Sequence, residues 1–151
     1  ADKTTPVAKG LMPTGKLADV ANTPMYFRKP VKIGERINAD DEQLKLGFGY
    51  DHNWVLNKHK ELQPKVVTVY EPESGRVMDV FTDQPGMQFY SGNFLDGTVK
   101  GKMGIMYKYR TGFCLEAQKF PDSPNQPSFP SARLDPGQTY RQTTTYRFGV
   151  R

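Results

Sequence analysis

Cysteine, histidine and long apolar runs are scarce in this 151-residue chain, and each scarcity excludes a class of protein. Cys114 is the sole cysteine, so the chain cannot form an internal disulfide. The two histidines, His52 and His59, are too few to build a zinc site with that cysteine. No apolar run approaches the roughly 20 residues that a membrane-spanning helix needs, so we expect no membrane partner.

The same features bear on the cellular compartment. A single cysteine fits a reducing environment, and residues 1–5 are too polar for the start of a signal peptide. We therefore expect a cytoplasmic protein, with a periplasmic location as the alternative. The sequence begins without Met, so a processed or truncated N-terminus is a further expectation.

Charge is moderate and dispersed. The net charge of +5 comes from 21 basic and 16 acidic residues. The basic residues form two loose clusters, Lys58, Lys60 and Lys65 in one, and Lys100, Lys102, Lys108 and Arg110 in the other. A nucleic-acid surface would need a denser basic stripe interleaved with aromatic residues. We therefore expect no nucleic-acid partner.

The spacing of glycine and proline predicts an all-β chain forming one domain over residues 1–151. The 14 glycines and 12 prolines interrupt the sequence at short intervals, and no long segment keeps a 3.6-residue apolar period. The first 40 residues should be irregular, with one helical turn at most, over residues 36–42. The predicted strands are residues 43–46, 54–56, 65–70, 76–82, 87–91, 113–118 and 140–150.

Residues 71–75 should form a hairpin loop between two of these strands. The segment reads Glu-Pro-Glu-Ser-Gly, with Pro72 early and Gly75 late. A glycine at the end of such a loop supplies the left-handed conformation that the chain needs to return as the next strand.

Glu116 is unusual because it lies inside a short apolar run that reads as a strand. A carboxylate there costs free energy unless it is solvated, hydrogen-bonded or used. The following loop, residues 120–130, is rich in proline, asparagine, aspartate and serine, and could form a stiff rim around a pocket. The alternative is a glutamate on the solvent face of an ordinary strand.

Alternation along two predicted strands places polar residues on one face of each. Cys114, Glu116 and Gln118 share a face, as do Gln88 and Tyr90. If the two strands face one another, these side chains would line a polar pocket suited to a polyhydroxylated ligand.

Three motifs occur in order along the chain: GFGYDHNWVLN at residues 47–57, GMQFYSGNFLDG at 86–97, and the Glu116 strand with its proline-rich loop. With these motifs the sequence closely resembles the aldose 1-epimerase, or galactose mutarotase, family. The resemblance implies an antiparallel β-supersandwich that interconverts the α and β anomers of free hexoses such as galactose and glucose. It implies no cofactor and no metal.

The resemblance also implies roles for three residues. Glu116, in the Cys-Leu-Glu motif, would be the general base. Asp51, in Tyr-Asp-His, and Gln88, in Gln-Phe-Tyr, would bind the sugar. The family does not use the histidine of Tyr-Asp-His as its acid, so His52 is not given that role.

Members of this family are about twice as long, and the chain matches only their C-terminal half. The acid histidine, a second histidine and a substrate-binding arginine belong to the other half. We therefore expect a partner, the N-terminal half of the same enzyme. Without it, sheet edges and apolar faces should be uncovered.

Plainer alternatives accompany these expectations. Asp51 could be a turn or cap residue, Gln88 a polar strand residue, and His52 a structural hydrogen-bond partner. For Trp54 and Phe89, a place in the core is a better explanation than stacking against a sugar. The alternative function is a non-catalytic carbohydrate-binding protein of the same fold. An epimerase for phosphorylated sugars would need an arginine cluster, which the sequence does not clearly offer.

Overall fold

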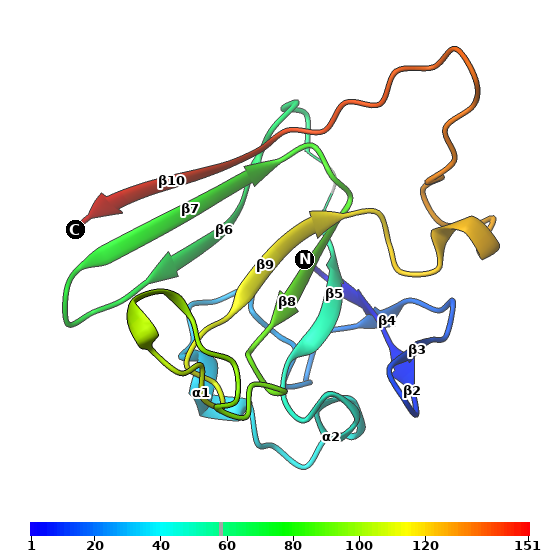
Figure 1. Cartoon of the computed structure of the whole chain (residues 1–151). Coiled ribbons are helices and arrows are strands. Elements are labelled where there is room, and N and C mark those ends of the chain that lie inside the picture. Colours follow the sequence, from blue (N-terminus) through cyan, green and yellow to red (C-terminus); the bar gives the residue numbers. More distant parts are fainter. Residues whose placement is uncertain (58) are drawn as a thin grey trace.

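The computed structural model describes residues 1–57 and 59–151, and its regular structure is mostly antiparallel β-sheet (Figure 1). This confirms the all-β prediction. No helix in the described part of the chain is long and apolar enough to cross a membrane. Lys58, in the first loose basic cluster, lies outside the described residues.

The larger sheet has five antiparallel strands in the order β4-β1-β5-β8-β9. Its last three strands carry the three motifs side by side. Strand β5 begins three residues earlier than predicted, so Asp51 lies within the strand. The bounds are β1 (Lys3–Thr5), β4 (Ala18–Asp19), β5 (Asp51–Val55), β8 (Gly86–Tyr90) and β9 (Cys114–Gln118).

A second sheet pairs three strands in the order β10-β7-β6, and a third pairs β2 with β3. The predicted hairpin between β6 and β7 is confirmed. Gly75 adopts φ +72°, and the Glu71 N–H donates to the Arg76 carbonyl at 2.9 Å. The bounds are β6 (Lys65–Tyr70), β7 (Arg76–Thr82), β10 (Thr144–Val150), β2 (Val7–Ala8) and β3 (Met12–Pro13).

The strand predicted at residues 43–46 is wrong, because this segment is helix α2 (Glu42–Gly47). Asp41 is its N-cap, and the Asp41 carboxylate accepts hydrogen bonds from the backbone N–H groups of Gln43 and Leu44 at 2.9 and 3.2 Å. Such a cap satisfies amide groups that would otherwise lack partners, and it outweighs the short apolar alternation that suggested a strand.

The helical turn predicted over residues 36–42 is also displaced. Only the two end residues of this range are helical, because α1 (Ile33–Arg36) ends at Arg36 and α2 begins at Glu42. The remaining helical pieces are short 3₁₀ turns, η1 (Lys102–Gly104) and η2 (Ser123–Asn125).

An aromatic core supports strands β5 and β8 from one side of the five-stranded sheet. Trp54 and Phe89 are 7% and 8% exposed, so they are core residues, as the plainer alternative held. Phe27 packs edge-on against Tyr50, Trp54 and Phe89, with ring centroids 5.2, 5.8 and 5.9 Å away. The Trp54 indole N–H donates to the Met25 carbonyl at 3.0 Å. This packing holds the strands whose other face carries polar residues.

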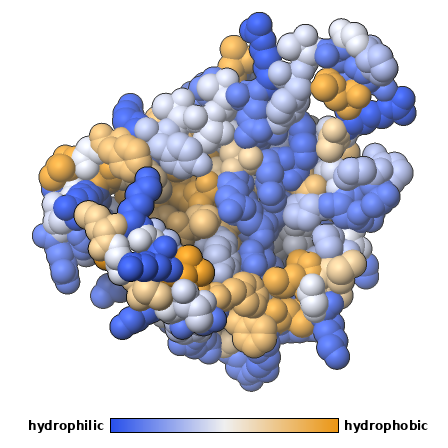
Figure 2. Space-filling view, viewed as in Figure 1, coloured by the Kyte–Doolittle hydropathy of each residue, from blue (hydrophilic) through white to orange (hydrophobic). Residues whose placement is uncertain are grey.

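Apolar surface remains uncovered elsewhere, in agreement with the expectation. On β10, Phe148 and Val150 are 74% and 76% exposed, and Met103, in the 3₁₀ turn η1 between β8 and β9, is 92% exposed. Figure 2 shows apolar surface gathered in a hollow left of the centre of the molecule. The two larger sheets do touch, because the Tyr146 hydroxyl donates to the Leu115 carbonyl on β9 at 2.7 Å.

Candidate functional site

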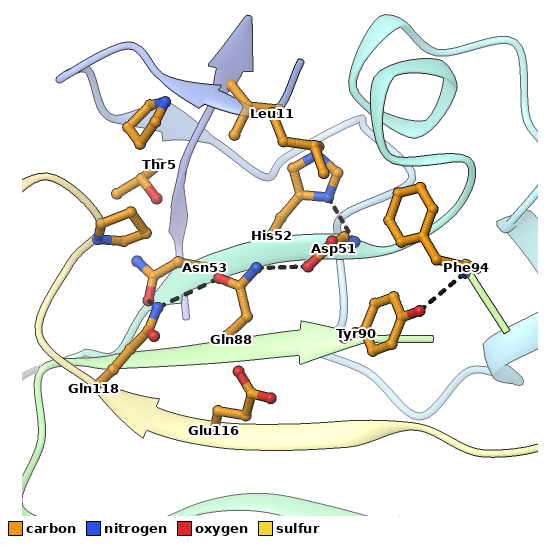
Figure 3. Close-up of a pocket in the computed structure, with 13 residues that line it drawn as sticks. Thr5, Leu11, Asp51, His52, Asn53, Gln88, Tyr90, Phe94, Glu116 and Gln118 are labelled. Atoms are coloured by element: carbon orange, nitrogen blue, oxygen red, sulfur yellow. Dashed lines mark hydrogen bonds between the residues drawn. The ribbon is translucent and has the colours of Figure 1, made fainter. Parts of the chain in front are cut away.

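A cavity of about 450 Å³ lies over the polar face of the five-stranded sheet (Figure 3). Its volume falls within the usual range for small-molecule sites. All three predicted site residues, Asp51, Gln88 and Glu116, line it. The other lining residues are Thr5, Val7, Leu11, Pro13, His52, Asn53, Tyr90, Phe94, Gln118 and Pro121.

Strand register brings the polar side chains together. Gln88 on β8 lies opposite Asn53 on β5 and opposite Glu116 on β9, so the three share one face. The condition considered for the pocket, that β8 and β9 face one another, is not met, because they are hydrogen-bonded neighbours in one sheet. The N-terminal segment, with Leu11 and Pro13, supplies part of the opposing wall.

The sugar-site candidates Asp51 and Gln88 form a hydrogen-bonded pair. The Gln88 amide nitrogen donates to the Asp51 Oδ1 at 2.8 Å. The Gln88 carbonyl oxygen in turn accepts from the Gln118 amide at 3.3 Å, and that amide also donates to the Asn53 Oδ1 at 3.2 Å. Neither candidate is therefore an isolated surface residue, and Asp51 is a strand residue rather than a turn or cap.

Glu116 is exposed and reaches from β9 toward Gln88 (Figure 3). Among the described residues, none donates a hydrogen bond to its carboxylate. The alternative of a solvent-facing glutamate is thus half right, since the side chain is solvated but lies in the cavity wall. A solvated carboxylate with free lone pairs can accept a proton or hydrogen bond from a ligand.

His52 is buried at 1% exposure and holds the start of β5. Its Nδ1 accepts a hydrogen bond from the Asp51 backbone N–H at 3.1 Å, so the expectation of a structural role is confirmed. Burial lowers the pKa of His52 to about 4. The ring is therefore neutral at physiological pH, which leaves Nδ1 free to accept. Its Nε2 has no hydrogen-bond partner among the residues that the structure describes.

Asn93 fixes the turn that leads into Asp51, and the sequence reasoning missed it. The Asn93 amide donates to the carbonyls of Gly47 and Tyr50, each at 2.9 Å, and its oxygen accepts from the Ser91 hydroxyl at 2.8 Å. Gly49, at φ +137°, lies so close that a side chain there would collide with Asn93. The Ser-Gly-Asn sequence in the second motif is a signal that could have identified Asn93, although its partners Gly47 and Tyr50 lie far away in the sequence.

Aromatic residues form another part of the wall. Tyr90 and Phe94 stack, with ring centroids 6.0 Å apart and planes 12° apart. The Tyr90 hydroxyl accepts from the Phe94 backbone N–H at 2.9 Å, which fixes the pair. Tyr90 lines the cavity, as its strand face predicts, whereas Trp54 and Phe89 belong to the core.

The loop after β9 reaches the cavity through Pro121, as the predicted rim requires. Asp122 adopts φ +64° and accepts hydrogen bonds from the side-chain amides of Asn125 and Gln126 at 2.6 and 2.7 Å. The Gln126 side chain occupies the space where Gly15 lacks one. Across residues 1–57 and 59–151, no group of three or more His, Cys, Asp or Glu side chains could hold a metal ion.

Comparison with known proteins agrees with these features. The family model described as aldose 1-epimerase matches residues 1–147. The human protein named galactose mutarotase is 47% identical over 150 residues, covering 99% of this chain and 42% of its own length. The Escherichia coli protein named aldose 1-epimerase is 37% identical, with 98% and 43% covered. The chain thus spans less than half the length of these curated relatives.

Solved structures give the same result for the fold. The GalM/aldose epimerase homologue from C. elegans aligns with a TM-score of 0.87 at 30% identity, covering 99% of this chain and 44% of that one. Galactose 1-epimerase from Lactobacillus acidophilus aligns with a TM-score of 0.73 at 29% identity. The predicted fold class is therefore confirmed. Since the family model matches nearly every residue and the motifs lie around one cavity, the chain belongs to the aldose 1-epimerase family.

Proposed function

We propose that this chain forms part of an aldose 1-epimerase that interconverts the α and β anomers of free hexoses such as galactose and glucose. The observation that carries the proposal is the convergence of Asp51, Gln88 and Glu116 on one face of the sheet, inside one cavity. A carboxylate beside a fixed donor–acceptor pair can bind a sugar and remove a proton from one of its hydroxyl groups, which is the base half of the reaction.

Glu116 is the proposed general base. Its carboxylate would take the proton from the sugar O1 hydroxyl while the C1–O5 bond breaks and C1 becomes an aldehyde carbon. An acid must deliver a proton to the ring oxygen O5 in the same step. After rotation about the C1–C2 bond, the reverse transfers close the ring on the other face. A well-placed base contributes about 10²–10⁴-fold to such a step.

Asp51 and Gln88 are the proposed sugar-binding pair. The Asp51 carboxylate accepts hydrogen bonds from hydroxyl groups, and the Gln88 amide can both donate and accept. Their mutual hydrogen bond at 2.8 Å holds both side chains in place before any ligand arrives. Such preorganisation reduces the entropy that is lost when the sugar binds.

The acid is proposed to come from another segment. His52 is the one histidine among the described lining residues, and its pKa of about 4 leaves it unprotonated near neutral pH. The chain covers 42% of the human relative. We infer that residues 1–151 are the C-terminal portion of a single domain, and that an N-terminal half supplies the acid. Uncovered apolar side chains such as Phe148 support a companion of this kind.

A non-catalytic carbohydrate-binding protein is the alternative function. It is less well supported, since a pure binding site has no need of a solvated Glu116 carboxylate that accepts no hydrogen bond from the described residues. A phosphorylated substrate is disfavoured. The cavity wall carries Asp51 and Glu116, and its described lining residues include no lysine or arginine.

Polarimetry on freshly dissolved α-D-galactose tests the proposal. The chain should be co-expressed with the N-terminal part of a galactose mutarotase and compared with Glu116→Gln. The exposed Glu73→Gln change is the matched control. We expect faster mutarotation than in buffer, a loss of about 10²-fold or more in Glu116→Gln, and no loss in the control. Normal turnover by Glu116→Gln would rule out this base, and galactose binding without turnover would favour the binding protein.

A further inference from the structure

The orientation of the Gln88 side chain depends on Gln118, a second glutamine in the cavity wall. Gln88 carries an amide whose two ends differ, one donating and one accepting hydrogen bonds. An ionised Asp51 carboxylate can only accept, so Gln88 must turn its NH₂ group toward Asp51. The carbonyl end of Gln88 then points the other way, and it needs a donor of its own.

Gln118 supplies that donor. Its amide nitrogen lies 3.3 Å from the Gln88 carbonyl oxygen and 3.2 Å from the Asn53 Oδ1, so its two N–H bonds can serve both acceptors. Asn53 is 1% exposed, so its Oδ1 offers the Gln118 amide a buried acceptor. The hydrogen bonds therefore run in one direction, from Gln118 through Gln88 to Asp51, as Figure 3 shows.

Gly86 makes this contact between separated strands feasible. Asn53 lies on β5 and Gln118 on β9, with β8 between them. Gly86 is the β8 residue opposite Gln118, and a side chain there would collide with the Asn53 Oδ1. Because glycine has no Cβ, the two amides can meet above the middle strand.

We propose that Gln118, anchored on Asn53, is a positioning residue that fixes the Gln88 amide in one orientation. One Gln88 N–H then binds Asp51, and the other remains available to a sugar oxygen. The arrangement gives the ligand a donor on Gln88 beside an acceptor on Asp51. The role toward sugar rests on the proposed function, whereas the orientation of Gln88 does not.

The orientation can be measured without sugar. In ¹⁵N-labelled chain, the Gln88 side-chain NH₂ signals are assigned by their loss in Gln88→Met. Gln118→Met keeps the length of the side chain but removes its donors, and should shift and broaden those signals. Gln118→Glu should move them further, because the new carboxylate accepts from the Gln88 NH₂ and draws it away from Asp51. Gln142→Met removes a contact with β9 outside the cavity and should leave them unchanged.

The role toward sugar is measured with the complete enzyme described above. In Gln118→Met, the Gln88 N–H is no longer held ready for a sugar oxygen. KM for galactose should therefore rise about tenfold, which is the effect of losing one hydrogen bond. The value of kcat should change less than about twofold. In a Gln88→Met background, the same change should have no further effect, because Gln118 acts only through Gln88. Gln142→Met should keep the wild-type KM.

The outcomes separate the two proposals. Unchanged Gln88 signals in Gln118→Met would overturn the positioning role whatever the kinetics show. Additive effects in the double variant would overturn it too, since they mean that Gln118 acts independently of Gln88. Shifted signals with non-additive KM effects would establish it. Shifted signals in a complete protein that neither binds nor converts galactose would refute the proposed function, and would leave the orientation of Gln88 supported.

Discussion

Burial of His52 should make the stability of this chain depend on pH. The pKa of this imidazole falls from 6.5 to about 4 because burial penalises its charged form. The folded chain thus binds the proton more weakly than the unfolded chain. Stability is therefore fully present above about pH 6.5 and is lost as the pH falls toward 4. Since each pKa unit is worth about 1.4 kcal/mol, about 3 kcal/mol is lost across this window.

Urea unfolding between about pH 7.5 and 4.5 measures the effect, with His52→Asn as the non-titrating variant. The asparagine Oδ1 can replace Nδ1 as the acceptor for the Asp51 backbone N–H. We expect the wild type to lose about 2–3 kcal/mol more than His52→Asn over this range. His59 is exposed, so His59→Asn should follow the wild type.

Parallel stability curves for the wild type and His52→Asn would refute this reasoning. NMR provides a second readout, because the chain contains two histidines and the His52 signals are assigned by their loss in His52→Asn. The His52 titration should have its midpoint near 4. A midpoint near 6.5 would mean that the folded state accommodates the charged ring. Protonation should also weaken sugar binding, because a protonated Nδ1 cannot accept from the Asp51 N–H.

Two further predictions concern the support of the site and its surroundings. Asn93→Ala should lower the free energy of unfolding by about 1–3 kcal/mol, because the buried Gly47 carbonyl loses its side-chain donor, whereas the Tyr50 carbonyl keeps its hydrogen bonds from Ser91. Urea unfolding checks this, with the exposed Asn125→Ala as control, and a loss below that of the control would contradict it. Phe148→Ser should change the stability of the isolated chain by less than about 0.5 kcal/mol. The same change should weaken assembly with an N-terminal half in a titration monitored by mutarotation, and unaltered assembly would mean that the companion binds elsewhere.

Alternation along single strands predicted the polar face of the site well. Gln88 and Tyr90 on β8, and Glu116 and Gln118 on β9, all line the cavity from the predicted faces, whereas Cys114, predicted on the same face of β9, is not a lining residue. The burial of Trp54 also followed from its size and character. These features depend on local geometry, which a sequence pattern records directly.

Features that depend on pairing between strands could not be predicted in this way. Alternation says which side chains share a face, but not which strands are neighbours, so it does not reveal that β8 and β9 lie side by side in one sheet. The contact of Gln118 with Asn53 depends on the register of three strands and on Gly86 between them. The wrong strand at residues 43–46 has a local cause instead. Asp41 is a recognisable N-cap, and its signal for a helix outweighs that of the short apolar run.

The outer edge of β9 has a consequence for how this chain can associate. Two of its carbonyl groups, on Leu115 and Ala117, already accept hydrogen bonds from the side chains of Tyr146 and Gln142, at 2.7 and 3.0 Å. An incoming strand would have to displace both side chains before it could extend the sheet. These contacts therefore act as a guard against edge-to-edge polymerisation, a hazard for any sheet that ends in an open strand. A companion chain would meet less resistance by covering the apolar hollow than by lengthening the sheet at this edge.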